Sequence, residues 1–289
     1  MDLKKYLEEK KDLIDPGLKA RLPKDDGLLS QAMRYLALAP GKRLRAVLVM
    51  ASAESVKKEA SAVIDAACAV EMAHTFSLIH DDLPCMDDDD LRRGLPTSHK
   101  KFGEAVAVLA GDSLLALAFE TLGKSKAAPA AVNRALVEFA AALGCRGMAL
   151  GQTMDILSEG KQISLEELCM IHARKTGDLI STSCMLGAVL SEASENDIRV
   201  LSEYGWHIGM AFQIKDDILD IEGSSESIGK PQGSDLKKKK ATFPSLIGLE
   251  NSKKALADHI TAAMDCLKGF GDQAKPLRLL AVYTGTRTK

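Results

Sequence analysis

Residues 69–87 of this chain read AVEMAHTFSLIHDDLPCMD, an apolar run that ends in closely spaced aspartates. The apolar part is typical of a buried helix. A second segment, residues 212–220 (FQIKDDILD), has the same form. The aspartates of the two clusters are Asp81, Asp82, Asp87, Asp216, Asp217 and Asp220.

Carboxylates crowded this closely repel one another and raise each other's pKa unless cations neutralise them. The hard cation that accepts a few carboxylates and completes its shell with water and phosphate oxygens is magnesium. An acidic run alone is more often a solvated loop or an interaction tail. Here each cluster ends an apolar run, and Asp216 and Asp220 share one helix face because they are four residues apart. The pattern predicts two clusters that face each other and hold a diphosphate through several metal ions.

The composition favours helices and argues against several classes of protein. Of the 289 residues, 46% are hydrophobic but only 4% are aromatic, and the net charge is −2. Nothing in that balance suggests nucleic acid binding. The six cysteines are scattered without a CxxC pair, which is typical of reduced thiols in a cytoplasmic protein.

Two further patterns concern membranes and targeting. The N-terminal segment MDLKKYLEEKKDL has the pattern of a charged amphipathic helix and not of a signal peptide. The apolar runs are interrupted by Asp, Glu, His or Gly before they reach about 18 residues, so we expect no membrane span.

Helical periodicity dominates the chain, and no strand alternation is visible. The segment Ser164-Leu-Glu-Glu167 has the form of a capping box, which marks a helix start. We therefore expect an all-α fold. Helices are predicted near residues 2–14, 28–38, 43–57, 60–82, 103–124, 130–158, 164–190, 194–221, 245–268 and 274–285.

With these motifs, DDxxxxD and DDxxD, the chain resembles the trans-isoprenyl diphosphate synthases, and most of all their bacterial farnesyl diphosphate synthases. The Pro84-Cys85 pair inside the first motif is similar to bacterial farnesyl and to bacterial and plant geranylgeranyl enzymes. One departure is Ala46, where the family usually has proline, and it points to a local change at the entry to that helix. The other similar segments are GKRLR (41–45), RRGLPTSHKKFGEA (92–105), LAGDSLL (109–115), GQTMDI (151–156), ARKTGDLI (173–180) and GKPQGSD (229–235).

The resemblance implies one polyprenyl synthetase domain over residues 1–289, folded as a single large helical bundle around a central cavity. It also implies a homodimer with its interface near residues 103–158. The implied activity is a magnesium-dependent prenyl transfer, in which dimethylallyl or geranyl diphosphate condenses with isopentenyl diphosphate and diphosphate is released. Three magnesium ions are implied, two held by Asp81 and Asp87 and the third by Asp216.

The resemblance assigns the remaining site residues as well. Arginine suits such a role because its planar fork binds phosphate oxygens in pairs. The residues implied for the allylic diphosphate are Arg92, Lys175, Thr176, Gln213, Lys230 and Lys240. Those implied for isopentenyl diphosphate are Gly41, Lys42, Arg45, His74 and Arg93. The set expected to carry catalysis is Asp81, Asp82, Asp87, Arg92, Lys175, Asp216 and Lys230.

Phe76 matches the position, five residues before the first aspartate, that often limits product length in this family. On a helical wheel Ser77 lies more directly beneath Asp81 than Phe76 does. An aromatic floor predicts a fifteen-carbon product, farnesyl diphosphate, with a geranylgeranyl diphosphate synthase as the alternative. A class I terpene cyclase is more remote, because DDILD lacks the Asn, Ser or Thr and Glu of the second cyclase motif. A non-catalytic prenyltransferase subunit is equally remote, because such subunits generally lose one aspartate motif.

Overall fold

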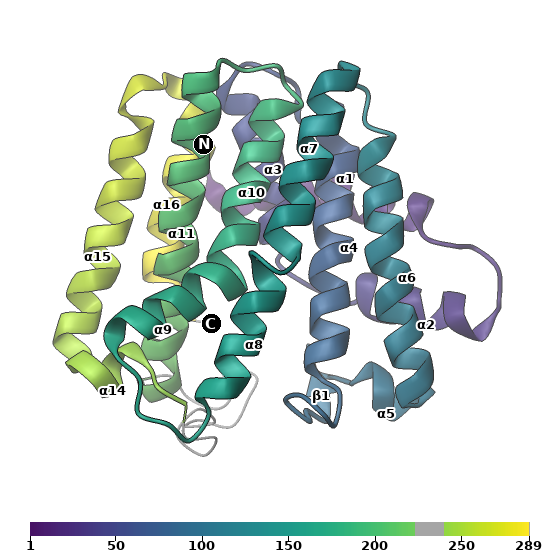
Figure 1. The fold of residues 1–289 in the computed structure, drawn as a ribbon. Coiled ribbons are helices and arrows are strands. Elements are labelled where there is room, and N and C mark those ends of the chain that lie inside the picture. Colours follow the sequence, from purple (N-terminus) through teal and green to yellow (C-terminus); the bar gives the residue numbers. More distant parts are fainter. Residues whose placement is uncertain (223–239, 289) are drawn as a thin grey trace.

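The computed structural model describes residues 1–222 and 240–288. These residues fold into a bundle of helices that pack around a shared hydrophobic core (Figure 1). The prediction of an all-α fold is confirmed. The helices are α1 (Leu3–Arg21), α2 (Leu28–Ala37), α3 (Leu44–Ser55), α4 (Ile64–Asp81), α5 (Ser98–Phe102), α6 (Glu104–Gly123), α7 (Pro129–Leu143), α8 (Met148–Ser158), α9 (Leu165–His172), α10 (Asp178–Val189), α11 (Glu195–Glu222), α14 (Phe243–Ile247), α15 (Leu249–Cys266) and α16 (Lys275–Thr286). Short 3-10 turns lie at Ala60–Val63, Leu267–Gly269 and Asp272–Ala274.

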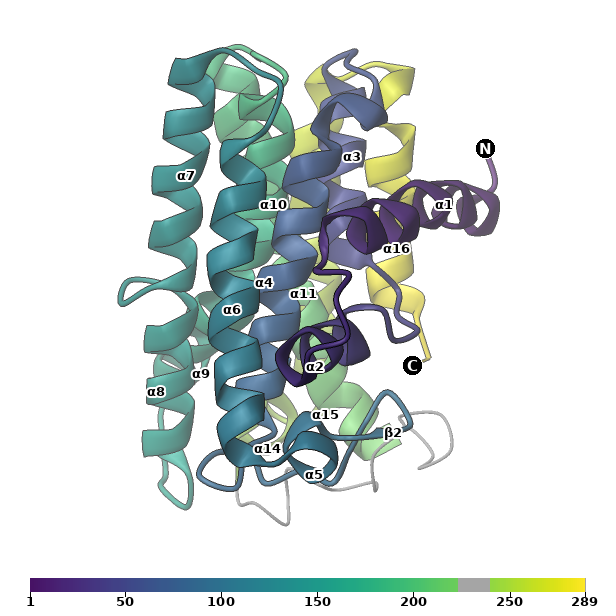
Figure 2. The ribbon, with the colours of Figure 1, turned by 90° about the vertical axis from the view of Figure 1, so that its right-hand side faces the viewer.

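The long helices α3, α4, α6, α7, α10 and α11 run roughly along one direction, and α1 lies across one side of them (Figure 2). The apolar helix α4 packs against α3 and α6, and α11 packs against α10 and α15. Both α4 and α11 end at the same end of the bundle, the lower end in Figure 1. This arrangement brings together the two aspartate clusters, because each cluster lies at the C-terminal end of its helix.

Helix boundaries differ from the expected ones where glycine or a partner element changes the local geometry. The helix expected over 130–158 is two helices, separated at Gly144–Gly147. A Cβ at Gly147 would lie 2.1 Å from the carbonyl oxygen of Ala142, so only glycine permits this tight turn. The helix expected at 2–14 continues through Pro16 to Arg21, whose guanidinium donates to Asp65 of α4 at 2.8 Å.

Two features were not expected from the sequence. A π-helical turn at Ala173–Gly177 joins α9 to α10 inside the helix predicted over 164–190. A short antiparallel hairpin, β1 (Leu91–Arg92) and β2 (Leu95–Pro96), follows the first aspartate cluster. By contrast, the predicted capping box is present, because Ser164 accepts from the Glu167 N–H and Glu167 accepts from the Ser164 N–H.

Two helices bear on the expectation that no segment spans a membrane. Ala60–Asp81 and Glu104–Gly123 are each long and apolar enough to cross a membrane by length and composition. Asp65, Glu71 and His74 interrupt the first segment, and Gly111 and Asp112 interrupt the second, in agreement with the sequence pattern. This is weak evidence of a span, because core helices pass the same test, and 61% and 39% of the two apolar windows are buried in the bundle.

Candidate active site

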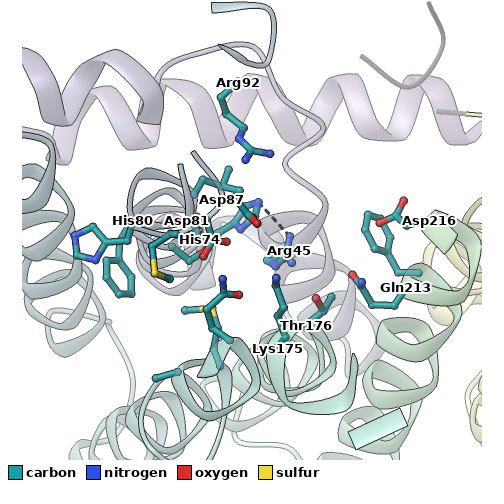
Figure 3. A pocket seen from close by; sticks show the side chains of 18 of the residues that line it. Arg45, His74, His80, Asp81, Asp87, Arg92, Lys175, Thr176, Gln213 and Asp216 are labelled. Carbon is teal, nitrogen blue, oxygen red and sulfur yellow. Dashed lines mark hydrogen bonds between the residues drawn. The ribbon is translucent and has the colours of Figure 1, made fainter. Parts of the chain in front are cut away.

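A cavity of about 740 Å³ opens between α4, α8, the π-helical turn and α11, and its lining includes residues from both aspartate clusters (Figure 3). Asp81 and Asp87 lie on one side of the cavity and Asp216 lies on the other. Lys175 and Thr176 lie between them. Among the predicted site residues, those that line the cavity are Arg45, His74, Phe76, Ser77, Asp81, Asp87, Arg92, Lys175, Thr176, Gln213 and Asp216.

The chain folds back after α4 so that the first cluster surrounds the end of its helix. The backbone N–H of Asp87 donates to the carbonyl oxygen of Asp81 at 2.8 Å, which returns Asp87 to the side of Asp81. Asp88, the next residue, has a left-handed backbone with φ of 50°. The second cluster needs no such loop, because Asp216 and Asp220 lie one helical turn apart on α11 and both line the cavity.

The second aspartate of each Asp-Asp pair, Asp82 and Asp217, binds protein groups instead of lining the cavity. Asp82 is fully buried and accepts from the Arg92 guanidinium, with Arg92 Nε at 2.8 Å. Asp217 accepts from the backbone N–H of Phe243 at 2.9 Å and lies 3.1 Å from His172 Nε2. Asp82 therefore orients Arg92, which does line the cavity, and any part that Asp82 takes in catalysis would act through that arginine.

Burial destabilises the ionised form of the cavity carboxylates, so nearby positive charge is needed to stabilise it. Burial, opposed by Lys175 and reinforced by Asp87, raises the pKa of Asp81 to about 6. Burial also raises the pKa of Asp216, against the effect of its ion pair with Arg287 at 2.6 Å. Asp87 in turn lies 3.3 Å from Lys240 Nζ. Side-chain cations thus lie where a metal cation would be stabilised.

The donor set fits magnesium ions that are only partly enclosed by protein. Within residues 1–222 and 240–288, no three His, Cys, Asp or Glu side chains converge on one point that could hold a metal. Carboxylate oxygens from Asp81, Asp87 and Asp216 could each supply a small share of an octahedral shell. Magnesium commonly takes its other ligands from water and substrate phosphate, which suits an open cavity of this kind.

A half-buried arginine–histidine pair forms the basic wall of the cavity. Arg45 Nη1 lies 3.2 Å from His74 Nε2, and because a guanidinium can only donate, His74 Nε2 must accept. Arg45 Nε is buried and finds no hydrogen-bond partner within the described part of the chain. Burial first, and then the charges of Arg45 and Arg93, hold the pKa of His74 well below its usual value. A neutral His74 beside an arginine with an unused donor is suited to an anionic ligand.

The other residues predicted for isopentenyl diphosphate lie beside this wall and do not line the cavity. Arg93 has a left-handed backbone with φ of 55°, and its Nη1 donates to the Leu36 carbonyl at 3.4 Å. A Cβ at Gly41 would lie 3.2 Å from Arg93 Cζ, so Gly41 leaves room for that guanidinium. Lys42 Nζ lies 6.0 Å from the centre of the Tyr283 ring.

Two predicted lysines meet on one carboxylate, Asp155, and of these two lysines Lys175 lines the cavity and Lys240 does not. Lys175 Nζ donates to Asp155 Oδ2 at 2.7 Å, and Lys240 Nζ donates to the same oxygen at 3.0 Å. The π-helical turn places Lys175 there, and a Cβ at Gly151 would lie 2.1 Å from the Lys175 backbone nitrogen. Lys230, the third lysine predicted for the allylic diphosphate, lies outside the described residues.

Sequence reasoning missed Arg287 and Asp155. Arg287 follows α16 and is buried, donates to the carbonyl of Phe212 at 2.9 Å, and lies 4.0 Å above the Phe212 ring. A single basic residue near a C-terminus carries no signal that predicts such a contact. Asp155 lies in the segment GQTMDI, so the family-like motif was visible, but nothing in it predicted a lysine pair.

The comparisons with known proteins agree with this geometry. The polyprenyl synthetase family profile matches residues 26–274. A farnesyl diphosphate synthase of Geobacillus stearothermophilus is 45% identical, over 93% of this chain and 92% of its own. A chloroplastic heterodimeric geranylgeranyl pyrophosphate synthase large subunit 1 of Arabidopsis thaliana is 46% identical, over 99% of this chain and 80% of its own.

A solved structure gives the same result. An FPP/GFPP synthase from Zymomonas mobilis superposes with a TM-score of 0.88 at 36% identity, covering 98% of this chain and 99% of its own. The fold and the cavity define a trans-prenyltransferase of the isoprenoid synthase type. The chain belongs to the polyprenyl synthetase family, the trans-isoprenyl diphosphate synthases.

The neutral state of His74 predicts a pH dependence of stability. The unfolded chain takes up a proton on this imidazole below about pH 6.5, whereas the folded protein does not. Because the folded pKa is lowered, the stabilisation is present above about pH 6.5 and is lost as the pH falls. We expect the free energy of unfolding of the wild type to fall between pH 6.5 and 5 more steeply than that of His74→Gln, by up to about 1.4 kcal/mol per pH unit.

Urea denaturation at a series of pH values measures this difference. His259, whose burial and proximity to His207 lower its pKa to about 4, contributes in the same direction in both proteins and cancels. Parallel stability curves for the wild type and His74→Gln would show that the folded protein protonates His74 normally.

Proposed function

We propose that this protein is a magnesium-dependent farnesyl diphosphate synthase that condenses dimethylallyl or geranyl diphosphate with isopentenyl diphosphate. The observation that carries the proposal is one cavity lined by carboxylates of both aspartate clusters, by cationic groups and by the aromatic side chain of Phe76. The similarity to a protein named farnesyl diphosphate synthase supports the same product.

The proposed reaction breaks the allylic carbon–oxygen bond, forms a carbon–carbon bond to isopentenyl diphosphate, and releases diphosphate and a proton. Magnesium, when bound, supplies positive charge to the leaving diphosphate oxygens. Lys175 and Lys240 would exchange Asp155 for those oxygens, because a diphosphate offers more negative charge than one carboxylate. Arg92, held by Asp82, presents a preoriented guanidinium at the same cavity.

The second substrate would bind at the arginine–histidine wall. Arg45 Nε is a buried donor with no protein partner among the described residues, so a phosphate oxygen would satisfy it. A neutral His74 keeps the proton on Nδ1 and leaves Nε2 to accept from Arg45, which orients the guanidinium. Thr176 and Gln213 present neutral dipoles to the cavity, and such groups stabilise a cation without attacking it.

A geranylgeranyl diphosphate synthase is the second candidate, and one observation favours it. The 46% identical relative from Arabidopsis thaliana is named as a geranylgeranyl pyrophosphate synthase large subunit. The two candidates differ in the depth of the apolar end of the cavity, where Phe76 and Ser77 lie with Leu143 and Met148. The product length is therefore the measurement that separates them.

We further propose that the protein is a cytoplasmic homodimer. Exposed apolar side chains gather on α6, α7 and α8, the region expected to form the interface: Val108, Leu109, Val137, Leu150, Ile156 and Leu157. Contiguous exposed apolar surface commonly marks a protein interface. All six cysteines are free thiols, in keeping with a reducing compartment.

The dimer proposal predicts twice the chain mass in solution. Light scattering coupled to size-exclusion chromatography should give a dimer for the wild type and a larger monomer fraction for Leu109→Glu. Arg199→Glu, on an exposed part of α11, is the control. A wild type that stays monomeric at micromolar concentration would contradict the proposal.

The metal proposal predicts that Asp216→Asn loses most turnover while the protein remains folded. Losing one group that stabilises transition-state charge lowers the rate by about a hundredfold to a thousandfold. Diphosphate release from geranyl and isopentenyl diphosphate, measured against magnesium concentration, gives the comparison. Asp265→Asn, an exposed carboxylate paired with Lys268, is the matched control. Near-wild-type turnover of Asp216→Asn at saturating magnesium would remove Asp216 from the metal site.

The product proposal predicts mainly fifteen-carbon products from the wild type with excess isopentenyl diphosphate. Phe76→Ala removes the aromatic ring from the cavity, so the product distribution should move to twenty carbons or more. Chromatography of the dephosphorylated alcohols resolves the chain lengths. Mainly twenty-carbon products from the wild type would favour the geranylgeranyl candidate, and an unchanged distribution in Phe76→Ala would place the floor elsewhere.

A further inference from the structure

His80 lies between the ring of Phe76 and the backbone of α6. The two rings are four residues apart on α4 and meet edge to face, with centroids 4.8 Å apart and planes at 74°. Both side chains line the cavity. An edge-to-face pair of this kind favours one relative orientation of the two rings. The position of the Phe76 ring therefore depends on where His80 is held.

The neighbouring helix holds His80 in two ways. His80 Nε2 lies 3.1 Å from the carbonyl oxygen of Val108, and because a carbonyl can only accept, Nε2 carries the proton and donates. Asp112 Oδ1 lies 3.8 Å from the same nitrogen. The imidazole is thus oriented by α6, although it belongs to α4.

Gly111 provides the space in which the imidazole lies. A Cβ at this position would be 2.3 Å from His80 Nε2 and 2.5 Å from His80 Cδ2, closer than real side chains pack. Gly111 lies inside α6, where glycine costs helix stability relative to alanine. Its place in the helix is explained by the close approach of His80.

We propose that His80 is a positioning residue for product length, held by Val108 and Gly111 of α6 so that the Phe76 ring stays across the apolar end of the cavity. This inference rests on the proposed prenyl transfer and on Phe76 as the floor. Without the imidazole, the Phe76 ring has space on the α6 side and can turn out of the path of the growing chain. Gly111 acts only through His80, because an added methyl group would displace the imidazole.

The test compares product lengths from the wild type, His80→Ala, Gly111→Ala and the double variant, with excess isopentenyl diphosphate. The ratio of longer to shorter products should rise in both single variants by about two- to tenfold, the range that an aromatic pair contributes to an orientation equilibrium. The double variant should resemble His80→Ala, because residues that act through one contact are not additive. The ratio is internal to each sample, so a lower rate next to Asp81 does not obscure it.

The matched control is Gly123→Ala on the same helix, where the nearest atom to an added Cβ is Leu136 Cδ1 at 4.0 Å. It should leave the product ratio unchanged. If Phe76→Ala lengthens the products but His80→Ala and Gly111→Ala do not, the positioning role is overturned while the floor stands. An additive double variant would also overturn the coupling through His80.

A second measurement needs no turnover and separates this inference from the proposed function. Protein labelled with 4-fluorophenylalanine should show the Phe76 resonance in 19F NMR, assigned by its loss in Phe76→Leu. His80→Ala and Gly111→Ala should shift or broaden that resonance, and Gly123→Ala should not. An unmoved Phe76 resonance in both variants would overturn the positioning role even if the protein made no prenyl product.

Discussion

The ion pair between Arg287 and Asp216, and the two lysines on Asp155, neutralise carboxylates that lie between packed helices. Unpaired charge on a partly buried carboxylate is costly because the surrounding protein replaces little of the lost hydration. In the proposed function, Asp216 would take part in binding magnesium and the two lysines would bind diphosphate. Binding of a metal–diphosphate would therefore exchange partners among groups that are already charged, and no new charge need be created inside the protein.

This charge arrangement depends on where the helices end. The buried helix α4 carries the first cluster to the end of the bundle where α11 carries the second, so apolar packing along the helices positions the acidic groups. Asp82 and Asp217 then connect these helix ends to other elements, Asp82 to Arg92 of β1 and Asp217 to the Phe243 N–H of α14. Asp82 and Asp217 are buried, so they bind protein groups, whereas Asp81 and Asp216 face the cavity.

Local backbone irregularities place the cationic groups. The π-helical turn directs Lys175 and Thr176 toward the cavity, which a regular helix through 164–190 would not do at the same register. Arg93 has a left-handed backbone, which a residue other than glycine adopts at some cost. Such conformations are maintained by their surroundings, and here the surroundings are the packed helix ends and the space left by Gly41. The cost is consistent with a group held in place for binding.

Much of the fold and part of the site could be predicted from the sequence. Helical periodicity and the motif order indicated an all-α bundle with the two aspartate clusters facing each other, because both signals are local along the chain. The contact of Arg287 with Asp216 could not be predicted, since it joins residues 71 positions apart with no pattern between them. Three further features could not be predicted either: the contact of both Lys175 and Lys240 with Asp155, the helix break at Gly147, and the packing of His80 on Gly111. The sequence by itself determined which chemical groups the protein has and which helices carry them. Only the tertiary structure decided which carboxylates face the cavity and which cations they meet, because those choices depend on packing between helices distant in the chain.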